Sequence, residues 1–442
     1  MSADDKRPAK KKHGGADDWD DPIIRVSRVN RPPSPNLKLV VILSDGIRGH
    51  LNQSRGVAAW LSKRTDAEIL ELEVPDLKGI RRRKARGAAF KLLEGNRRRA
   101  RDWLALAEGE NALRTLGKWL LERNIRAGDT TSLILLSAGT MASFYNIAIG
   151  YIWRCTCITI MTPGVIGTAP FDFAIVPEHD CPKDVSNVLT TVGAPNLIVR
   201  EELSLVGESL LREFPPTRER RWGILIGGDD KNYRISAEWI YKQIGRIFHE
   251  AERISVDLYI ATSRRTSPAA EYALRRIAAN SSSVRFLLIA SSDPLNPVPA
   301  MLGACDEIFV TDDSVNMVSE AVTAGHRAVL LRTERVGAIK RNMQRATSLL
   351  VSAGFLPRRA LWGVPRFDQT FKKFIKMDLL IEFRDWIRER RRDELSPFAP
   401  LDEQLDIDHD GFNEARRAAD WILDNLGDVV HYDELDEPVE SD

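Results

Sequence analysis

Short apolar runs alternate with longer amphipathic stretches along the first half of the chain. The apolar, largely β-branched run from Leu37 to Leu43 predicts a buried strand at 38–43. The same pattern predicts further strands and helices: strands at 68–74, 133–136, 155–161, 171–176 and 188–191, and helices near 52–64 and at 140–149. Strands that alternate with helices pair in parallel through right-handed crossovers. Residues 37–199 are therefore expected to form a doubly wound, Rossmann-like domain.

The alternation starts again after a polar stretch, residues 200–221, which is predicted to connect two domains. A strand from Trp222 runs into Gly227 and Gly228, and an amphipathic helix is expected at 237–251. Further strands follow at 255–261, 284–289, 307–310 and 328–331. Residues 222–363 thus form a second predicted Rossmann-like domain. Because open α/β sheets bind ligands at the carboxyl ends of their strands, we expect the two domains to face each other across a cleft that holds the site.

The two ends of the chain differ from its middle. Residues 1–36 contain eight Lys or Arg and six Asp and end in a Pro-rich run, so they are predicted to be a disordered N-terminal tail. Residues 364–426 are expected to be C-terminal helices that pack back on the body, with one amphipathic helix at 367–392 and another at 411–426. Residues 427–442 carry seven acids and no Lys or Arg, which predicts a disordered acidic tail.

Composition limits the classes of function. The formal net charge of +1 argues against a surface built for nucleic acid, so no nucleic-acid partner is expected. The four cysteines form no C-x-x-C pair, which predicts reduced thiols, no metal and a cytoplasmic protein. The longest apolar stretch, 141–161, is interrupted by Asn146 and Arg154 and is better explained by a helix and a strand than by a membrane span.

One local segment is strongly basic. Residues 81–101 carry ten Lys or Arg and one acid, Glu94, with apolar residues interspersed. A basic stripe with a small apolar face can lie against anionic lipid headgroups, which would place the protein peripherally on the inner face of a membrane. A solvated basic face and a nucleic-acid contact are the alternatives that the residues leave open.

A Gly-punctuated loop follows the first strand. Gly46 and Gly49 allow a sharp turn and a close approach of a ligand, while the amides at the start of the following helix face negative charge. His50 is expected to project into the same crevice. The loop is therefore a candidate cradle for an anion or a sugar. The alternative is a helix-capping loop with a solvent-facing histidine.

Three loops of the second half can converge on one phosphorylated ligand. Gly227, Gly228 and Lys231 follow a strand, although Asp229 and Asp230 between them repel phosphate. Arg264 and Arg265 follow the next strand and offer guanidinium forks. Ser314 can cap a helix, and Glu320, two turns further, can accept hydrogen bonds from a ribose diol. The alternatives are two surface arginines on a turn and a well-capped helix.

Several motifs occur together and in order between residues 38 and 345. They are Ser44-Asp45-Gly46 with Gly49-His50-x-Asn52-Gln53, Pro177-Glu178-His179-Asp180, Gly193-Ala194-Pro195, Ile226-Gly227-Gly228, Thr262-Ser263-Arg264-Arg265-Thr266, and Asp313-Ser314-Val315-x-Met317-x-Ser319-Glu320. This set resembles the mitochondrial-fission "elongated mitochondria" family. That family includes bacterial proteins and a plant adaptor that recruits a dynamin-related protein.

The layout also resembles, more distantly, GT-B glycosyltransferases that add N-acetylglucosamine to a membrane-bound peptidoglycan precursor. The resemblance implies a GT-B-like α/β fold of two doubly wound domains and a nucleotide-sugar substrate without a metal or cofactor. It places acceptor and donor groups on two sets of residues: the acceptor loop of Gly46, Gly49, Asn52 and Gln53, and the donor-binding residues Gly227, Gly228, Lys231, Arg264, Arg265, Ser314 and Glu320. His50 would be the catalytic base, with Asp45 as an alternative base or as its orienter.

The sequence departs from those transferases at Asp229-Asp230-Lys231 and at Lys340-Arg341-Asn342-Met343-Gln344. Three hypotheses follow from the two resemblances. The first is a glycosyltransferase that acts on a lipid or cell-envelope acceptor. The second is a noncatalytic adaptor that binds a membrane or a partner, and the third is a sugar-nucleotide epimerase.

Overall fold

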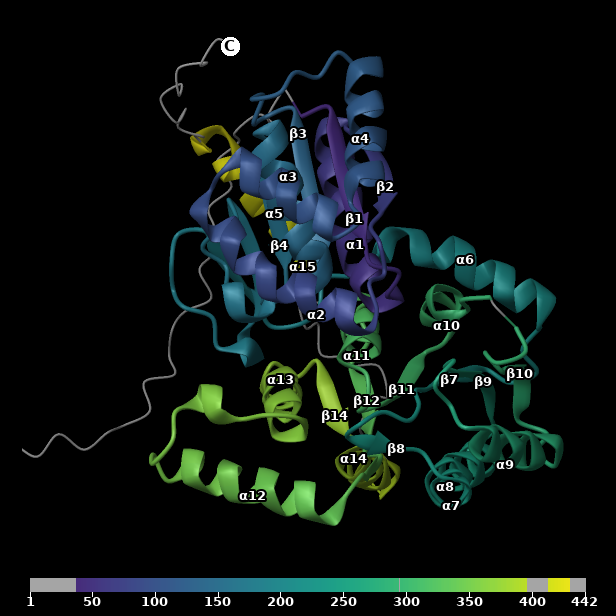
Figure 1. Cartoon of the computed structure of the whole chain (residues 1–442). Helices are drawn as coiled ribbons and strands as arrows, with labels where there is room; N and C mark the ends of the chain where they lie inside the picture. The colour runs from purple at the N-terminus through teal and green to yellow at the C-terminus, as the bar shows by residue number, and fades with distance from the viewer. Residues whose placement is uncertain (1–36, 294, 396–411, 430–442) are drawn as a thin grey trace, which may run out of the picture. The chain divides into compact units, whose positions relative to one another are not determined.

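Two parallel sheets form the framework of the protein. The computed structural model describes residues 37–293, 295–395 and 412–429 (Figure 1). The first sheet has the strand order β2-β1-β3-β4-β5-β6. Its strands are β1 (Leu39–Ser44), β2 (Glu68–Glu73), β3 (Leu133–Ala138), β4 (Thr156–Ile160), β5 (Phe173–Pro177) and β6 (Val188–Thr191). Each predicted strand of the first domain is present, within a few residues of the expected bounds.

Both faces of the first sheet are covered by helices. Val40 and Ile42 of β1 pack on one side and Leu39 and Val41 on the other, because alternate side chains of a strand point to opposite faces. One layer consists of α1 (Arg48–Thr65) and α15 (Glu414–Asn425), which come from opposite ends of the chain (Figure 1). The other layer consists of α2 (Gly79–Ala88), the 3-10 helix η1 (Ala89–Glu94), α3 (Arg97–Leu106), α4 (Glu110–Glu122) and α5 (Thr140–Trp153).

The second sheet repeats the design with the order β10-β9-β7-β11-β12-β14, again all parallel. Its strands are β7 (Arg220–Ile226), β9 (Val256–Thr262), β10 (Val284–Leu288), β11 (Glu307–Thr311), β12 (Ala328–Leu331) and β14 (Leu380–Glu382). A short antiparallel pair, β8 (Tyr233–Arg234) with β13 (Glu334–Arg335), lies apart from it. The chain therefore has the GT-B-like architecture of two doubly wound α/β domains that the sequence predicts.

Helices cover both faces of the second sheet as well. One layer is α6 (Arg200–Glu213), α10 (Val298–Ala304), α11 (Val315–Thr323) and α13 (Val364–Lys376). The other layer is α7 (Ala237–Trp239), the π-helical turn η4 (Ile240–Ile244), α8 (Gly245–Arg253), α9 (Pro268–Ala279) and α14 (Phe383–Leu395). Helix α12 (Ala338–Ser352) buries only Gln344. Short 3-10 turns complete the described chain: η2 (Gly164–Ile166), η3 (Glu178–Asp180), η5 (Arg358–Ala360) and η7 (Leu426–Asp428).

Three local expectations differ from the structure. Helix α1 begins at Arg48 rather than near residue 52, because the left-handed Gly46 (φ +77°) turns the chain at once. The predicted connection 200–221 contains helix α6 and the first two residues of β7. The single helix expected at 367–392 is interrupted by β14, because Leu380 pairs with Ala328 of β12 and extends the sheet.

The apolar stretch 141–161 consists of helix α5 followed by strand β4, as predicted. Among the described residues, no helix is both long and apolar enough to cross a bilayer. The predicted N-terminal tail, 1–36, lies outside the described residues. Of the predicted acidic tail, only residues 427–429 are described.

Helix α6 is fixed to the second domain by a close helix crossing. A side chain at Gly303 of α10 would overlap the carbonyl oxygen of Leu203, and one at Gly207 of α6 would overlap the backbone of Gly303. Backbone atoms cannot yield as a flexible side chain does. The predicted connection 200–221 is therefore a packed helix over most of its length.

We expect Gly303→Ala to lower the free energy of unfolding by about 1–3 kcal/mol, because the added methyl group overpacks the crossing of α6 and α10. Urea unfolding followed by circular dichroism measures the change. The control is Gly87→Ala in α2, where a Cβ meets no atom within 4 Å and alanine favours the helix. An equal effect of the two substitutions would contradict the close crossing.

Candidate functional site

An acid–imidazole pair lies at the end of strand β1. His50 in the first turn of α1 contacts Asp45 through Nδ1 and Oδ2 at 2.9 Å. Asp45 also accepts a hydrogen bond from the backbone N–H of Ile47 at 3.1 Å, which fixes the carboxylate. When Nδ1 donates to the carboxylate, Nε2 is the nitrogen that can accept a proton. The structure thus brings together the two residues that the sequence singled out as base and orienter.

The imidazole of His50 lies over Gly139, where any side chain would overlap the ring. Gly139 lies between the end of strand β3 and the start of α5. Strands β1 and β3 are neighbours in the sheet, and the helices that follow them lie on opposite faces, so His50 stands at the topological switch point of the first sheet. Within the described residues no side chain caps the start of α1 or α5. Their first amides therefore give the surroundings of His50 a positive potential.

The corresponding switch point of the second sheet lies between β7 and β11, and its backbone amides are already engaged. Gly227 N–H donates to Thr311 Oγ1 at 2.8 Å, and Gly228 N–H donates to Asp313 Oδ2 at 2.9 Å. Arg265 pairs with the same Asp313 oxygen at 2.7 Å. Asp313 therefore occupies the place at the glycine amides that the sequence suggested for a diphosphate. Burial raises the pKa of Asp313, against the hydrogen bonds that lower it.

The neighbouring Asp312 points the other way along the sheet edge. Its side chain is fully buried and accepts hydrogen bonds from Thr333, through N–H at 2.9 Å and the hydroxyl at 2.7 Å. Arg332 and Arg335 also donate to it, at 3.3 and 2.8 Å. The two adjacent acids thus tie β11 to the ends of β7 and β12.

The remaining donor-side residues of the prediction are spread over the rim. Lys231 and Arg264 are exposed. Ser314 caps α11 by accepting from Met317 N–H at 3.3 Å. Glu320 lies further along α11 and retains some exposed surface, yet burial of its carboxyl raises its pKa to about 7. Of the predicted donor residues, the structure joins only Gly227, Gly228 and Arg265 in one hydrogen-bonded cluster.

Helices α1 and α11 meet at their N-terminal turns and bring the two domains together. Gln53 Nε2 donates to Asn316 Oδ1 at 3.4 Å, and a Cβ at Gly49 would lie 3.1 Å from Asn316 Nδ2. Gln53 Oε1 is buried without a hydrogen-bond partner among the described residues, so it can accept from a bound hydroxyl. Asn52 is half-buried. The acceptor loop of the prediction therefore adjoins the helix that was predicted to bind the donor.

Two further contacts join the domains. Ala194 N–H donates to Ser319 Oγ at 3.0 Å, and Asn196 Nδ2 donates to Thr323 Oγ1 at 3.0 Å. Both acceptors lie on α11, about one and two turns from the start of the helix. The Gly193-Ala194-Pro195 motif therefore holds α11 against the first domain.

The Pro177-Glu178-His179-Asp180 motif forms a second clasp between the domains. His179 Nδ1 contacts Thr370 Oγ1 of α13 at 2.9 Å, and Arg366 donates to the carbonyl of His179 at 2.9 Å and pairs with Asp180. Lys373 pairs with Glu178. Burial lowers the pKa of His179. The sequence offered this motif only as part of a resemblance, and the hydrogen bonds show what its side chains contact.

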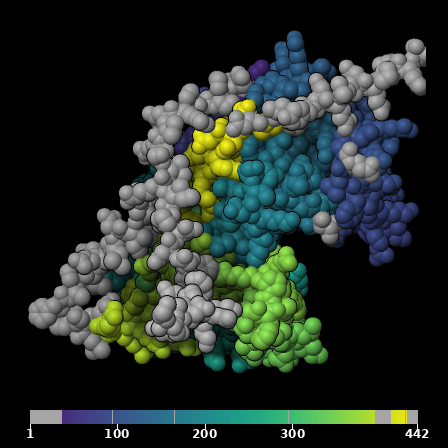
Figure 2. All heavy atoms as spheres, turned by 90° about the vertical axis from the view of Figure 1, so that its left-hand side faces the viewer, coloured from purple at the N-terminus to yellow at the C-terminus, as the bar shows by residue number. Residues whose placement is uncertain are grey.

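The described residues contain no group of three or more His, Cys, Asp or Glu side chains arranged to hold a metal ion. The basic segment 81–101 forms α2, η1 and part of α3. Ile80, Phe90 and Leu93 are exposed beside its cations, at 72%, 50% and 44% of their full surfaces. Figure 2 shows the atoms of this region, in dark blue, at the outer surface of the first domain.

Comparisons with known proteins identify one family. The family model described as "Mitochondrial fission ELM1" matches residues 48–426. No curated protein is significantly similar to the sequence.

Among solved structures, UDP-GlcNAc 2-epimerase from Methanocaldococcus jannaschii is similar at 11% identity, with a TM-score of 0.42 over 76% of this chain and 92% of that one. The glycosyltransferase SnogD from Streptomyces nogalater is similar at 15% identity, with a TM-score of 0.37 over 76% of this chain and 94% of that one. A UDP-glucosyltransferase from Polygonum tinctorium is similar at 9% identity, with a TM-score of 0.39 over 89% of this chain and 99% of that one. None of these likenesses assigns a substrate to this chain.

The raised pKa of Glu320 has a consequence for stability. Between its ordinary value of 4.5 and about 7, the carboxyl is protonated in the native state and ionised in the unfolded state. Unfolding then releases a proton, so native stability falls as pH rises through this interval. Glu320→Gln is neutral throughout, so the variant is expected to gain stability relative to the parent as pH rises from 4.5, and the gain should level off above about 7.

Thermal unfolding of both proteins from pH 4.5 to 8.5 measures the difference. The exposed Glu208 of α6 provides the control, Glu208→Gln, for which a flat difference is expected. A flat difference for Glu320→Gln as well would show that its carboxyl is not protonated in the native protein near neutral pH.

Proposed function

The chain belongs to the mitochondrial fission ELM1 family, and we propose that this member is a glycosyltransferase that moves a sugar from a nucleotide-sugar donor to a lipid or cell-envelope acceptor. One observation carries the proposal. The contacts of Gly49 and Gln53 with Asn316 set the turn that bears His50 beside the first turn of α11. An imidazole in contact with a carboxylate then lies next to the start of the helix proposed to bind the donor.

In this mechanism Nε2 of His50 takes the proton from an acceptor hydroxyl as its oxygen attacks the anomeric carbon. Asp45 holds the imidazole in the required tautomer and stabilises the imidazolium that forms. The bond between the anomeric carbon and the diphosphate breaks, and the diphosphate leaves with the electron pair. A GT-B fold stabilises this leaving group with helix N-termini and cationic side chains. Lys231 and Arg264 are the exposed cations of the second domain suited to the task.

Glu320 completes the donor side of the proposal. A carboxyl with a pKa of about 7 is partly neutral at physiological pH, so it can donate as well as accept. Such a group can bind the two hydroxyls of a ribose at a small desolvation cost. Gln53 Oε1, which is buried without a partner among the described residues, supplies an acceptor for a hydroxyl of the bound molecule.

The acceptor class rests on the surface of α2 and η1. Arg82 and Arg83 are exposed, and Ile80, Phe90 and Leu93 project apolar side chains from the same segment. Cations that surround exposed apolar side chains bind anionic bilayers, since the cations meet headgroups while the apolar groups enter the interface. This surface is proposed to dock the first domain on a membrane.

A second candidate function, a noncatalytic adaptor, is favoured by one specific observation. Asp313 already accepts from Gly228 N–H and pairs with Arg265, so the glycine loop of the second domain has no open place for a diphosphate. An adaptor needs no such place. A transferase must bind the diphosphate further out, at Arg264, Lys231 and the helix starts.

The first experiment is a thermal-shift screen against UDP-, GDP-, ADP- and CMP-sugars. Binding to the native state raises the unfolding temperature, so one nucleotide class is expected to give a concentration-dependent shift. With that donor and a membrane extract as acceptor, His50→Gln is expected to lower kcat by about 10²–10⁴-fold with little change in the KM of the donor. Asp45→Asn should cause a smaller loss.

His249 on α8 is exposed, so His249→Gln is the matched control and should leave the transfer rate unchanged. Absence of a shift with every nucleotide would support the adaptor instead. If a donor does bind but His50→Gln turns over like the parent, the proposed base is wrong.

The membrane surface is tested by sedimentation with vesicles that contain phosphatidylglycerol. We expect Arg82→Glu with Arg83→Glu to lower the partition coefficient about tenfold or more, since each cation at the surface contributes ~1 kcal/mol. The control is Arg275→Glu with Arg276→Glu, which reverses the charge of two adjacent exposed arginines of α9. Equal sedimentation of the parent and both variants would rule out docking through α2 and η1.

A further inference from the structure

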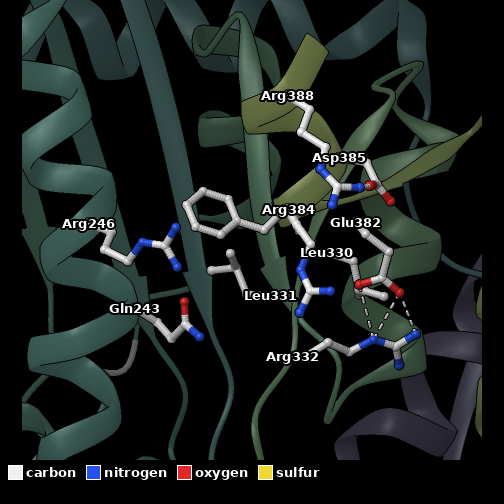
Figure 3. A pocket seen from close by; sticks show the side chains of 10 residues that line it. Gln243, Arg246, Leu330, Leu331, Arg332, Glu382, Arg384, Asp385 and Arg388 are labelled. Carbon is white, nitrogen blue, oxygen red and sulfur yellow. Dashed lines mark hydrogen bonds and ion pairs between the residues drawn. The ribbon is translucent and has the colours of Figure 1, made fainter. Parts of the chain in front are cut away.

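The second domain contains a pocket that none of the predicted site residues line. It has a volume of about 560 Å³ and lies between the η4–α8 helix and the start of α14, above the end of β12 (Figure 3). Its helices belong to the layer on the face of the sheet opposite α11. The pocket is therefore separate from the contact between α1 and α11 beside His50.

Charge in the pocket is unbalanced. Four arginines line it, Arg246, Arg332, Arg384 and Arg388, against two acids. Both acids are already paired, Glu382 with Arg332 at 2.6 Å and Asp385 with Arg388 at 3.0 Å. Among the described residues, no carboxylate lies within ion-pair distance of Arg246 or Arg384. Two positive charges therefore remain for an occupant.

The side chains around these two cations define the rest of the recognition surface. Arg246 lies over the ring of Phe383 at 5.5 Å, which fixes the direction of its guanidinium. Figure 3 shows Arg246 and Gln243 reaching from one wall of the pocket and Arg384 standing on the other side, with Leu331 between them. The polar groups thus come from two walls, and the floor is apolar.

The wall that carries Gln243 is irregular. Residues Ile240–Ile244 form a π-helical turn, and Gly245 follows with no atom within 4 Å of the place of a Cβ. A π turn widens the helix and is frequent at functional sites. Gln243 belongs to this turn, and Arg246 to the first turn of α8.

We propose that this pocket binds a phosphate monoester through Arg246 and Arg384. Guanidinium groups bind the oxygens of a phosphate dianion in pairs, and two unpaired guanidiniums match its two charges. Gln243 hydrogen-bonds to the phosphate or to an adjacent hydroxyl, and Leu331 forms the apolar floor beneath the carbon skeleton. The volume lies within the range of small-molecule sites, about 300–1,000 Å³.

Arg332 connects the pocket with the edge of the sheet that bears the glycine loop. It pairs with Glu382 in the pocket (Figure 3). It also pairs with Asp368 at 2.6 Å and with the buried Asp312 at 3.3 Å. Asp312 precedes Asp313, which holds the glycine loop of β7. A phosphate that attracts Arg332 or repels Glu382 acts on this chain of ion pairs, so occupancy of the pocket is coupled to the end of β11.

The test uses glycerol 3-phosphate as a soluble monoester and vesicles that contain phosphatidic acid as a lipid-borne one. Hydrogen–deuterium exchange of the whole protein reports on residues 240–246 and 383–388, and both segments are expected to become protected. Arg246→Gln with Arg384→Gln is expected to weaken binding about tenfold or more, because the variant removes both guanidinium groups that pair with the phosphate. Both side chains are exposed, so the double variant should fold.

Arg275→Gln with Arg276→Gln removes the same charge from α9 and should leave the protection intact. His50→Gln should also retain it, which separates this site from the proposed transferase site. Protection by glycerol 3-phosphate supports a soluble ligand, and protection by the vesicles alone supports a lipid headgroup. Protection by neither probe, or equal protection in the Arg246 and Arg384 double variant, would overturn the proposal.

Discussion

The structure depends on the close packing of α11 against the first domain. A Cβ at Gly56 of α1 would overlap the carbonyl of Asn196, and one at Gly193 would lie 2.9 Å from Ser319 Oγ and 3.0 Å from the ring of Phe374. Only glycine leaves room at these two positions for the backbone of Asn196 and for the side chains of Ser319 and Phe374. The approach allows Ser319 and Thr323 of α11 to accept hydrogen bonds from the 194–196 loop. This contact holds α11, which follows β11 at the second switch point, against the first domain.

The two switch points differ in how their polar groups are used. At the first sheet, the starts of α1 and α5 have no side-chain cap within the described residues, and Nδ1 of His50 contacts Asp45. At the second sheet, Thr311 and Asp313 satisfy the glycine amides. An internal carboxylate thus takes the position of an external anion. Helix N-termini without a side-chain cap are therefore found in the first domain, at α1 and α5, whereas the motifs suggested the glycine loop of the second domain as the place for an anion.

Asp312 and Asp313 are adjacent in the sequence, and their side chains bind different loops of the second domain. Asp313 binds the loop after β7, while Asp312 binds Thr333, Arg332 and Arg335 after β12. Strands β7, β11 and β12 are neighbours in the sheet, so one dipeptide fixes three strand ends. Burial raises the pKa of Asp313. For Arg332, burial lowers the pKa, but pairing with Glu382, Asp368 and Asp312 raises it by more, so the net shift is upward. The pocket at Arg246 and Arg384 is connected to this network through Arg332.

Local patterning determined most of the framework, because the alternation of buried strands and amphipathic helices is written in consecutive residues. It located both sheets and the apolar 141–161 stretch correctly. It missed β14, since a three-residue strand inside an amphipathic stretch shows only when Leu380 finds Ala328. It also set the start of α1 four residues late, because the turn at Gly46 and the bond from Ile47 to Asp45 decide that boundary.

The site divides in the same way. The Gly-punctuated loop after the first strand pointed to His50, and the resemblance to GT-B glycosyltransferases added Asp45 as an alternative base or its orienter. The structure shows that the two side chains are in contact. Tertiary structure alone decided that Asp313 fills the glycine loop, that His179 clasps α13, and that Arg246 and Arg384 share a pocket. In each case the two residues are more than 80 positions apart in the sequence. A polar side chain can hydrogen-bond to many groups, and only the fold decides which of them lies within reach.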